Sequence, residues 1–139
     1  MGVRIMLGDQ LGEEIGQITG TRVLPGANGP VVEVSFQSNG TLCGVRETNM
    51  GTYITTTRPD GTLSGEGQGV VMTDDGETAA WKGHGVGRFT GHGSAVSWRG
   101  AVYYETTSPR LARLTGVAGI FEYETDASGK VTSKIYEWK

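Results

Sequence analysis

The chain has 139 residues, a net charge of −3, a hydrophobic fraction of 36 % and one cysteine. This length predicts a single domain over residues 1–139 with a core of its own, and the acidic balance without a basic cluster argues against a nucleic-acid partner. One cysteine excludes an internal disulfide, and neither a signal segment nor a membrane-spanning stretch is found, so we expect a cytoplasmic protein with no membrane partner.

Patterns typical of β-strands cover nearly the whole chain and are separated by clusters of turn-forming residues. The expected strands span, in chain order, residues 10–24, 31–38, 41–58, 62–73, 77–89, 94–107, 117–125 and 131–138. Asn39-Gly40 is read as a hairpin turn between the second and third strands. The third is either one long bent strand or two short ones broken near residues 49–51.

One segment departs from the strand pattern. Ser108 is a typical helix-start residue, Pro109 fits the first helical position, and Gly116 is a typical stop. The pattern predicts one short helix, at about residues 109–115, immediately before the penultimate strand.

Glycine accounts for 24 residues, and in two predicted strands it recurs at every second position. These two rows are Gly65, Gly67 and Gly69, and Gly83, Gly85 and Gly87. Because side chains alternate faces along a strand, each row removes the side chains from one face. Closing a small sheet requires strong coiling and kinks, so the glycines favour an all-β, eight-stranded antiparallel up-and-down barrel over an open β-sandwich. Inward glycines would open space for a ligand, whereas outward glycines would let another element or subunit pack closely.

The run from Tyr103 to Glu124 places a strand, a Leu-x-x-Leu-x-Gly connection and an aromatic strand in succession. In this order, and in its length, strand count and glycine-rich strands, the chain resembles the allene oxide cyclase-like barrels. This calycin-like group includes plant allene oxide cyclases, dirigent proteins and bacterial spirotetronate cyclases. The resemblance implies an eight-stranded barrel with a ligand cavity, often in a dimer or trimer. No complete catalytic motif of those families is found, so the resemblance carries over no activity.

Familiar cofactor and metal motifs are absent from the sequence. It contains no phosphate loop, no dinucleotide fingerprint and no nucleophile elbow. Neither His84 nor His92 has cysteine or carboxylate neighbours at metal-ligand spacing. We therefore predict neither a metal nor a cofactor.

Polar candidates for a site lie on the third predicted strand. Glu47, Asn49 and Tyr53 share one face of it, so together they place a carboxylate, an amide and a phenol on one wall. If this face points inward, Glu47 and Tyr53 are candidates for proton transfer or polarisation, with His84 as a third, and Asn49 is a candidate ligand-binding residue. If it points outward, Glu47 is a solvated surface charge. The pattern leaves both registers open.

Aromatic candidates come from the later strands. Phe121 and Tyr123 share one face of their strand, as do Trp98 and Tyr104 of theirs. These rings form either the plain core of a filled barrel or the walls of a ligand cavity.

Three functions are compatible with these features. The first is a binding protein that holds a small, mainly apolar molecule in the barrel. The second is a cofactor-free isomerase or cyclase of the allene oxide cyclase-like type, acting on a flexible hydrophobic substrate. The third is a structural barrel with a solid interior, whose exposed apolar residues form the interface of a homo-oligomer.

Overall fold

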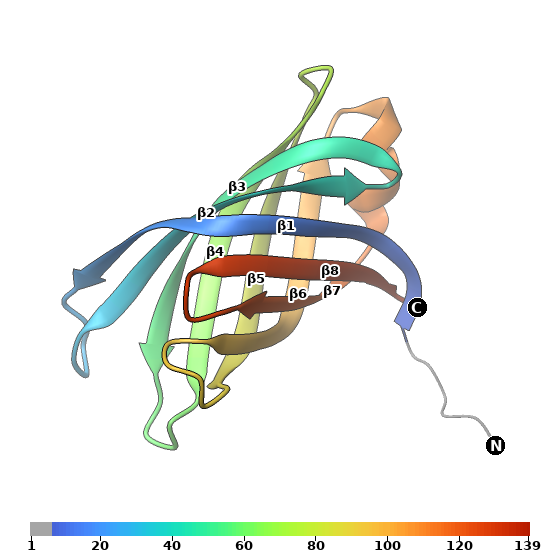
Figure 1. Cartoon of the computed structure of the whole chain (residues 1–139). Coiled ribbons are helices and arrows are strands. Elements are labelled where there is room, and N and C mark those ends of the chain that lie inside the picture. The colour runs from blue at the N-terminus through green and yellow to red at the C-terminus, as the bar shows by residue number, and fades with distance from the viewer. Residues whose placement is uncertain (1–6) are drawn as a thin grey trace.

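Eight antiparallel strands close into a barrel in the computed structural model, which describes residues 7–139 (Figure 1). The strands are β1 (Leu7–Leu24), β2 (Val31–Leu42), β3 (Val45–Thr57), β4 (Leu63–Thr73), β5 (Thr78–Phe89), β6 (Val96–Thr106), β7 (Gly119–Thr125) and β8 (Lys130–Trp138). Each pairs with its sequence neighbour, and β1 pairs with β8 to complete the ring. The predicted up-and-down barrel is therefore confirmed. Residues 1–6 of the predicted domain lie outside the described residues.

The turn predicted at Asn39-Gly40 is wrong. Strand β2 continues through both residues to Leu42, and the chain reverses at Cys43 and Gly44, whose φ angles are 53° and 75°. Positive φ at both central residues gives a turn whose twist suits a hairpin. Gly40 instead marks a close approach, because a Cβ atom there would collide with the carbonyl oxygen of Glu13 on β1.

Strand β3 is one unbroken element. Its register with β2 and β4 continues without interruption through Asn49, Met50 and Gly51, so of the two alternatives, one long strand or two short ones, the single strand is observed. Its inner face consequently includes Glu47, Asn49 and Gly51, all of which are buried. The sequence left open whether the face with Glu47 points inward or outward, and in the structure it points inward.

The short helix is a 3₁₀ helix, η1 (Pro109–Gly116), that lies at one end of the barrel. Leu111 and Leu114 are fully buried in the core cluster at that end, so η1 acts as an apolar cover. Ser108 precedes the helix but makes no side-chain cap; its hydroxyl donates to Glu77 instead. Arg113 pairs with Asp9 on β1 and Glu137 on β8, which attaches η1 to the strands where the barrel closes.

Two apolar clusters fill most of the barrel interior. The cluster nearest η1 contains Leu11, Leu42, Val71, Ala79, Val102, Tyr104, Leu111, Leu114 and Ile135. The second contains Phe36, Leu63, Val96, Trp98, Tyr123 and Val131. Trp81 and Phe121 pack against both clusters and so join them.

The glycine rows of β4 and β5 face inward, and aromatic rings lie over most of them. A Cβ atom at Gly65 would lie 2.6 Å from the Trp98 ring, and one at Gly69 would lie 2.5 Å from the Trp81 ring. On β5, the Phe121 ring would lie 2.9 Å from a Cβ atom at Gly85. The glycines thus make room chiefly for tryptophan and phenylalanine side chains.

Candidate functional site

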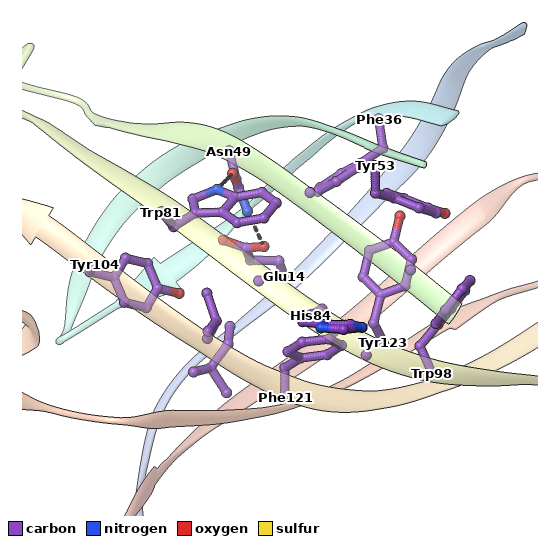
Figure 2. A pocket seen from close by; sticks show the side chains of 17 residues that line it. Glu14, Phe36, Asn49, Tyr53, Trp81, His84, Trp98, Tyr104, Phe121 and Tyr123 are labelled. Carbon is purple, nitrogen blue, oxygen red and sulfur yellow. Dashed lines mark hydrogen bonds between the residues drawn. The ribbon is translucent and has the colours of Figure 1, made fainter. Parts of the chain in front are cut away.

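A cavity of about 80 Å³ remains in the barrel interior (Figure 2). Its lining combines aromatic rings with a few polar groups and comes from β1 to β8. The residues are Glu14, Phe36, Asn49, Tyr53, Gly65, Gly67, Trp81, Gly83, His84, Gly85, Trp98, Val102, Tyr104, Phe121, Tyr123, Ser133 and Ile135.

Gly83 explains why this space stays open. A Cβ atom at Gly83 would have its nearest neighbour at 3.4 Å and the Trp81 and Phe121 rings at 3.7 and 3.8 Å, which are ordinary contact distances. No ring therefore lies directly over Gly83, unlike its row neighbour Gly85. Gly67, which is directly opposite on β4, also lines the cavity and has no side chain to fill it.

A chain of hydrogen bonds positions Glu14 at the cavity wall. The indole Nε1–H of Trp81 donates to Oδ1 of Asn49 over 2.7 Å, and Nδ2 of Asn49 donates to Oε1 of Glu14 over 3.0 Å (Figure 2). Because an indole N–H can only donate, the amide of Asn49 must turn its oxygen to Trp81 and its nitrogen to Glu14. Ser38 donates to the same Oε1, also over 3.0 Å. Glu14 is thereby held as an acceptor although the residue is only 4 % exposed.

A second glutamate lies beside the first. Gly40 of β2 is paired with Glu14 on one side and with Glu47 on the other, and both glutamates are buried on the inner face. Glu47 is 3 % exposed, and neither of its carboxyl oxygens has a hydrogen-bond partner among the described residues. Burial, reinforced by the neighbouring carboxylate of Glu14, raises the pKa of Glu47 to about 9. At neutral pH this carboxyl group therefore carries a proton.

Three tyrosines complete the polar part of the interior. Burial raises the pKa of Tyr53 to about 12, and it raises the pKa values of Tyr104 and Tyr123 as well. These phenols consequently stay protonated at any ordinary pH. The Tyr123 hydroxyl is buried without a hydrogen-bond partner among residues 7–139. The rings of Tyr53 and Tyr123 meet edge to face, with centroids 5.6 Å apart.

The residues proposed from the sequence fall into three groups. Those that line the cavity are Asn49, Tyr53, Trp98, Tyr104, Phe121 and Tyr123. Glu47 is buried next to Glu14 but does not itself line the cavity. His84 borders the cavity, but the residue is exposed and its Nε2 lies 3.4 Å from the Ser64 hydroxyl. Its imidazole is therefore not grouped with the buried Glu14 and Glu47.

Sequence reasoning missed Glu14, Trp81 and Phe36 as site residues. Glu14 is hard to find because the polarity of β1 is inverted there: Glu14 is buried, whereas Ile15 is 62 % exposed. A usable signal is the parity of the glycines. Gly12, Glu14 and Gly16 lie on the same face of β1, and Trp81 lies on the same face of β5 as its inward-facing glycines. A residue that shares a strand face with such glycines is therefore expected to point inward.

No helix among residues 7–139 is both long enough and apolar enough to cross a membrane. Within the same residues, no group of three or more histidine, cysteine, aspartate or glutamate side chains is arranged to hold a metal ion.

The fold and interior define this chain as a closed eight-stranded β-barrel with a small, partly polar internal cavity. No protein-family model and no curated protein matches its sequence.

Solved structures share the barrel over nearly their whole length. A β-barrel-like protein from Acinetobacter baumannii has a TM-score of 0.80 and 13 % identity, covering 100 % of this chain and 99 % of its own. A conserved protein of unknown function from Rhodopseudomonas palustris has a TM-score of 0.79 and 13 % identity, covering 96 % and 99 %. A protein of unknown function from Clostridium acetobutylicum has a TM-score of 0.78 and 13 % identity, covering 93 % and 96 %. At this level of identity the likeness establishes the fold alone.

Proposed function

We propose that this protein binds a small, mainly apolar molecule inside its barrel. The observation that carries the proposal is the cavity itself, which aromatic rings line on several sides while Glu14 and Asn49 provide convergent polar groups. A largely apolar pocket with a few precisely placed polar groups is the usual form of a small-molecule site. A ligand would also pair the hydroxyl of the cavity-lining Tyr123, which is otherwise buried without a hydrogen-bond partner among residues 7–139.

The cavity restricts the ligand to a compact molecule. Its volume of about 80 Å³ is well below the roughly 300–1,000 Å³ of sites for drug-sized ligands. A ligand of a few non-hydrogen atoms, or the short apolar arm of a larger molecule, suits this space.

Ligand binding is tested by thermal shift with a panel of compact apolar and amphiphilic molecules. A ligand that binds only the folded state raises the free energy of unfolding by RT ln(1 + [L]/Kd) and therefore raises the melting temperature. Gly83→Ala places a methyl group in the cavity without a clash and should abolish the shift. Gly20→Ala is the matched control, because no atom lies within 4 Å of a Cβ at that position. Absence of stabilisation across the panel, or equal stabilisation of both variants, would contradict the proposal.

The second candidate function is a cofactor-free isomerase or cyclase of the allene oxide cyclase-like type. It is favoured by the pair of buried glutamates, because the raised pKa of Glu47 leaves a protonated carboxyl group beside the carboxylate of Glu14. Such a pair has the two partners that acid–base catalysis needs. Product analysis after incubation with flexible hydrophobic substrates, comparing the wild type with Glu47→Gln, tests this function; equal turnover by the two would exclude Glu47 from it.

We further propose that the chain assembles through its outer faces in the cytoplasm, as a dimer or trimer. Closure of the barrel leaves little free strand edge for pairing among the described residues, chiefly at residues 19–24 of β1 beyond its pairing with β8. Met50, Met72 and Tyr103 are exposed on the outer surface. Light scattering coupled to size-exclusion chromatography measures the mass in solution, and a monomer at all concentrations would contradict this assembly. An assembled chain that binds no ligand would favour a structural role for the barrel.

A further inference from the structure

The interior of the barrel holds a carboxylate but, among the described residues, no cationic side chain. Glu14 and Glu47 are buried on the inner face, whereas every lysine, arginine and histidine among residues 7–139 is exposed. All the ion pairs of the described residues lie at the surface and involve other carboxylates. Among the described residues, no cationic side chain therefore pairs with the carboxylate of Glu14, whereas Glu47 is neutral because it carries a proton.

The hydrogen bonds around Glu14 favour a donor in the same way. The three donors around Glu14, which are Ser38, Asn49 and Trp81, each already have an acceptor. Both bonds to Glu14 end on Oε1, so neither occupies Oε2. Two other groups have no partner among the described residues: the protonated carboxyl group of Glu47, which does not line the cavity, and the hydroxyl of Tyr123, which can donate or accept. Because a carboxylate can only accept, a ligand group that meets Glu14 in the cavity has to be a donor.

Aromatic rings around the cavity favour the same kind of ligand. Tyr53, Trp81 and Tyr123 present electron-rich rings to this space, and a cation near the face of such a ring is stabilised, more strongly so when it is removed from water. An ammonium group offers three N–H donors and a positive charge, and no acceptor. An anion would meet Glu14 without any compensating cation.

We propose that the molecule held in the cavity is a compact organic cation, whose ammonium group pairs with Glu14 while its small apolar body lies among the aromatic rings. This inference rests on the proposed binding function and specifies the class of ligand. A divalent metal ion is a poorer occupant, because the described residues offer no cluster of three or more suitable ligands.

The test compares three molecules that share one branched hydrocarbon body: isobutylamine, which is protonated at neutral pH, isobutanol and isobutyrate. Binding is followed by two-dimensional ¹H–¹⁵N NMR through the indole N–H of Trp81, which donates to Asn49, the residue that in turn donates to Glu14. We expect isobutylammonium to shift this signal with a dissociation constant at least about tenfold below that of isobutanol, as one charge-assisted hydrogen bond provides. Isobutyrate should leave the signal unchanged.

Glu14→Gln removes the charge at nearly constant size and should reduce the affinity for isobutylammonium to that for isobutanol. Glu13→Gln is the matched control, because Glu13 is the adjacent residue of β1 and is exposed on the outer face; it should keep the wild-type preference. If Glu14→Gln does not fold, the comparison of the three ligands on the wild type still decides the matter.

The outcomes separate this inference from the proposed function. Equal binding of isobutanol and isobutylammonium, or preferential binding of isobutyrate, would overturn the preference for a cation and leave a ligand-binding barrel. If none of the three shifts the Trp81 signal, the cation is overturned, and the Gly83→Ala panel decides separately whether the cavity binds anything. An equal loss of affinity in Glu13→Gln would show that the charge of the whole protein, and not Glu14, attracts the amine.

Discussion

At the scale of single residues, the buried glutamates are the most costly feature of the interior. Moving a carboxylate out of water costs several kcal/mol unless hydrogen bonds or an opposite charge compensate. Glu14 obtains two hydrogen bonds, from Ser38 and Asn49, whereas Glu47 obtains none from the described residues and is protonated instead. The cost of burial is thus offset by hydrogen bonds at Glu14 and avoided by protonation at Glu47. The difference arises because only Glu14 lies next to hydrogen-bond donors.

The protonation of Glu47 makes the stability of the barrel depend on pH. Its pKa is raised from 4.5 to about 9 on folding, so between these values the folded state holds a proton that the unfolded state has released. The free energy of unfolding should therefore be highest at the acid end of this window and fall as the pH rises through it. Glu47→Gln, which cannot ionise, should lose this part of the pH dependence and gain stability relative to the wild type as the pH rises.

Urea unfolding of both proteins across this pH window measures the effect. Glu13→Gln serves as the control, because Glu13 is exposed, and its difference from the wild type should be small. A difference between Glu47→Gln and the wild type that stays constant with pH would show that Glu47 does not take up a proton on folding.

Residue patterns predicted the rings of the site better than its carboxylates. Trp98, Tyr104 and Tyr123 are large, apolar and regularly alternating, so burial of their face followed from the pattern. Glu14 could not be found in this way, because hydrophobicity alone predicts that Ile15 faces inward and Glu14 outward. The actual orientation is set by the register of β1 with β2 and β8, and register depends on pairing partners that are distant in the sequence.

At the scale of the strands, an aromatic ring from one strand packs over a glycine of another on the inner face of the barrel. Trp81 on β5 lies over Gly69 of β4, and Trp98 on β6 lies over Gly65. Such pairing lets a narrow, strongly coiled sheet contain bulky side chains without overpacking. The alternation of the glycines was visible in the sequence, but the ring that covers each one was not, because it comes from another strand.

Two glycines of adjacent strands should respond in opposite ways to alanine. At Gly69 a Cβ atom would lie 2.5 Å from the Trp81 ring and would collide with the backbone oxygen of Met50, so Gly69→Ala should cost about 1–3 kcal/mol. At Gly83 the nearest atom would be 3.4 Å away, so Gly83→Ala should be neutral or stabilise the fold by up to about 1 kcal/mol.

Chemical denaturation of the two variants beside the wild type gives both values. Because the substitution is the same and both positions lie on the inner face, differences in strand propensity largely cancel. Equal destabilisation by the two substitutions would mean that the space at Gly83 is not free.

At the scale of the whole molecule, closure of the barrel and continuity of the core depend on each other. Pairing of β1 with β8 over residues 7–17 of β1 closes the ring of strands, and residues of both apolar clusters line the cavity. Trp81 and Phe121 pack against both clusters and therefore connect the end covered by η1 with the opposite end. A barrel with two cores joined through two rings should still unfold as one unit, as small domains usually do.

Phe121→Ala tests this connection. The Phe121 ring lies against Gly85 and Gly100, neither of which can fill the space it would leave, so the substitution should cost about 3–5 kcal/mol. Tyr103→Ala removes an equally large ring from the exposed outer face of β6 and should change stability by no more than about 0.5 kcal/mol. Unfolding is followed by tryptophan fluorescence, which reports on the interior, and by far-ultraviolet circular dichroism, which reports on the strands. The two transitions should coincide in the wild type, and a wild type that unfolds in two separate steps would show that the clusters are independent.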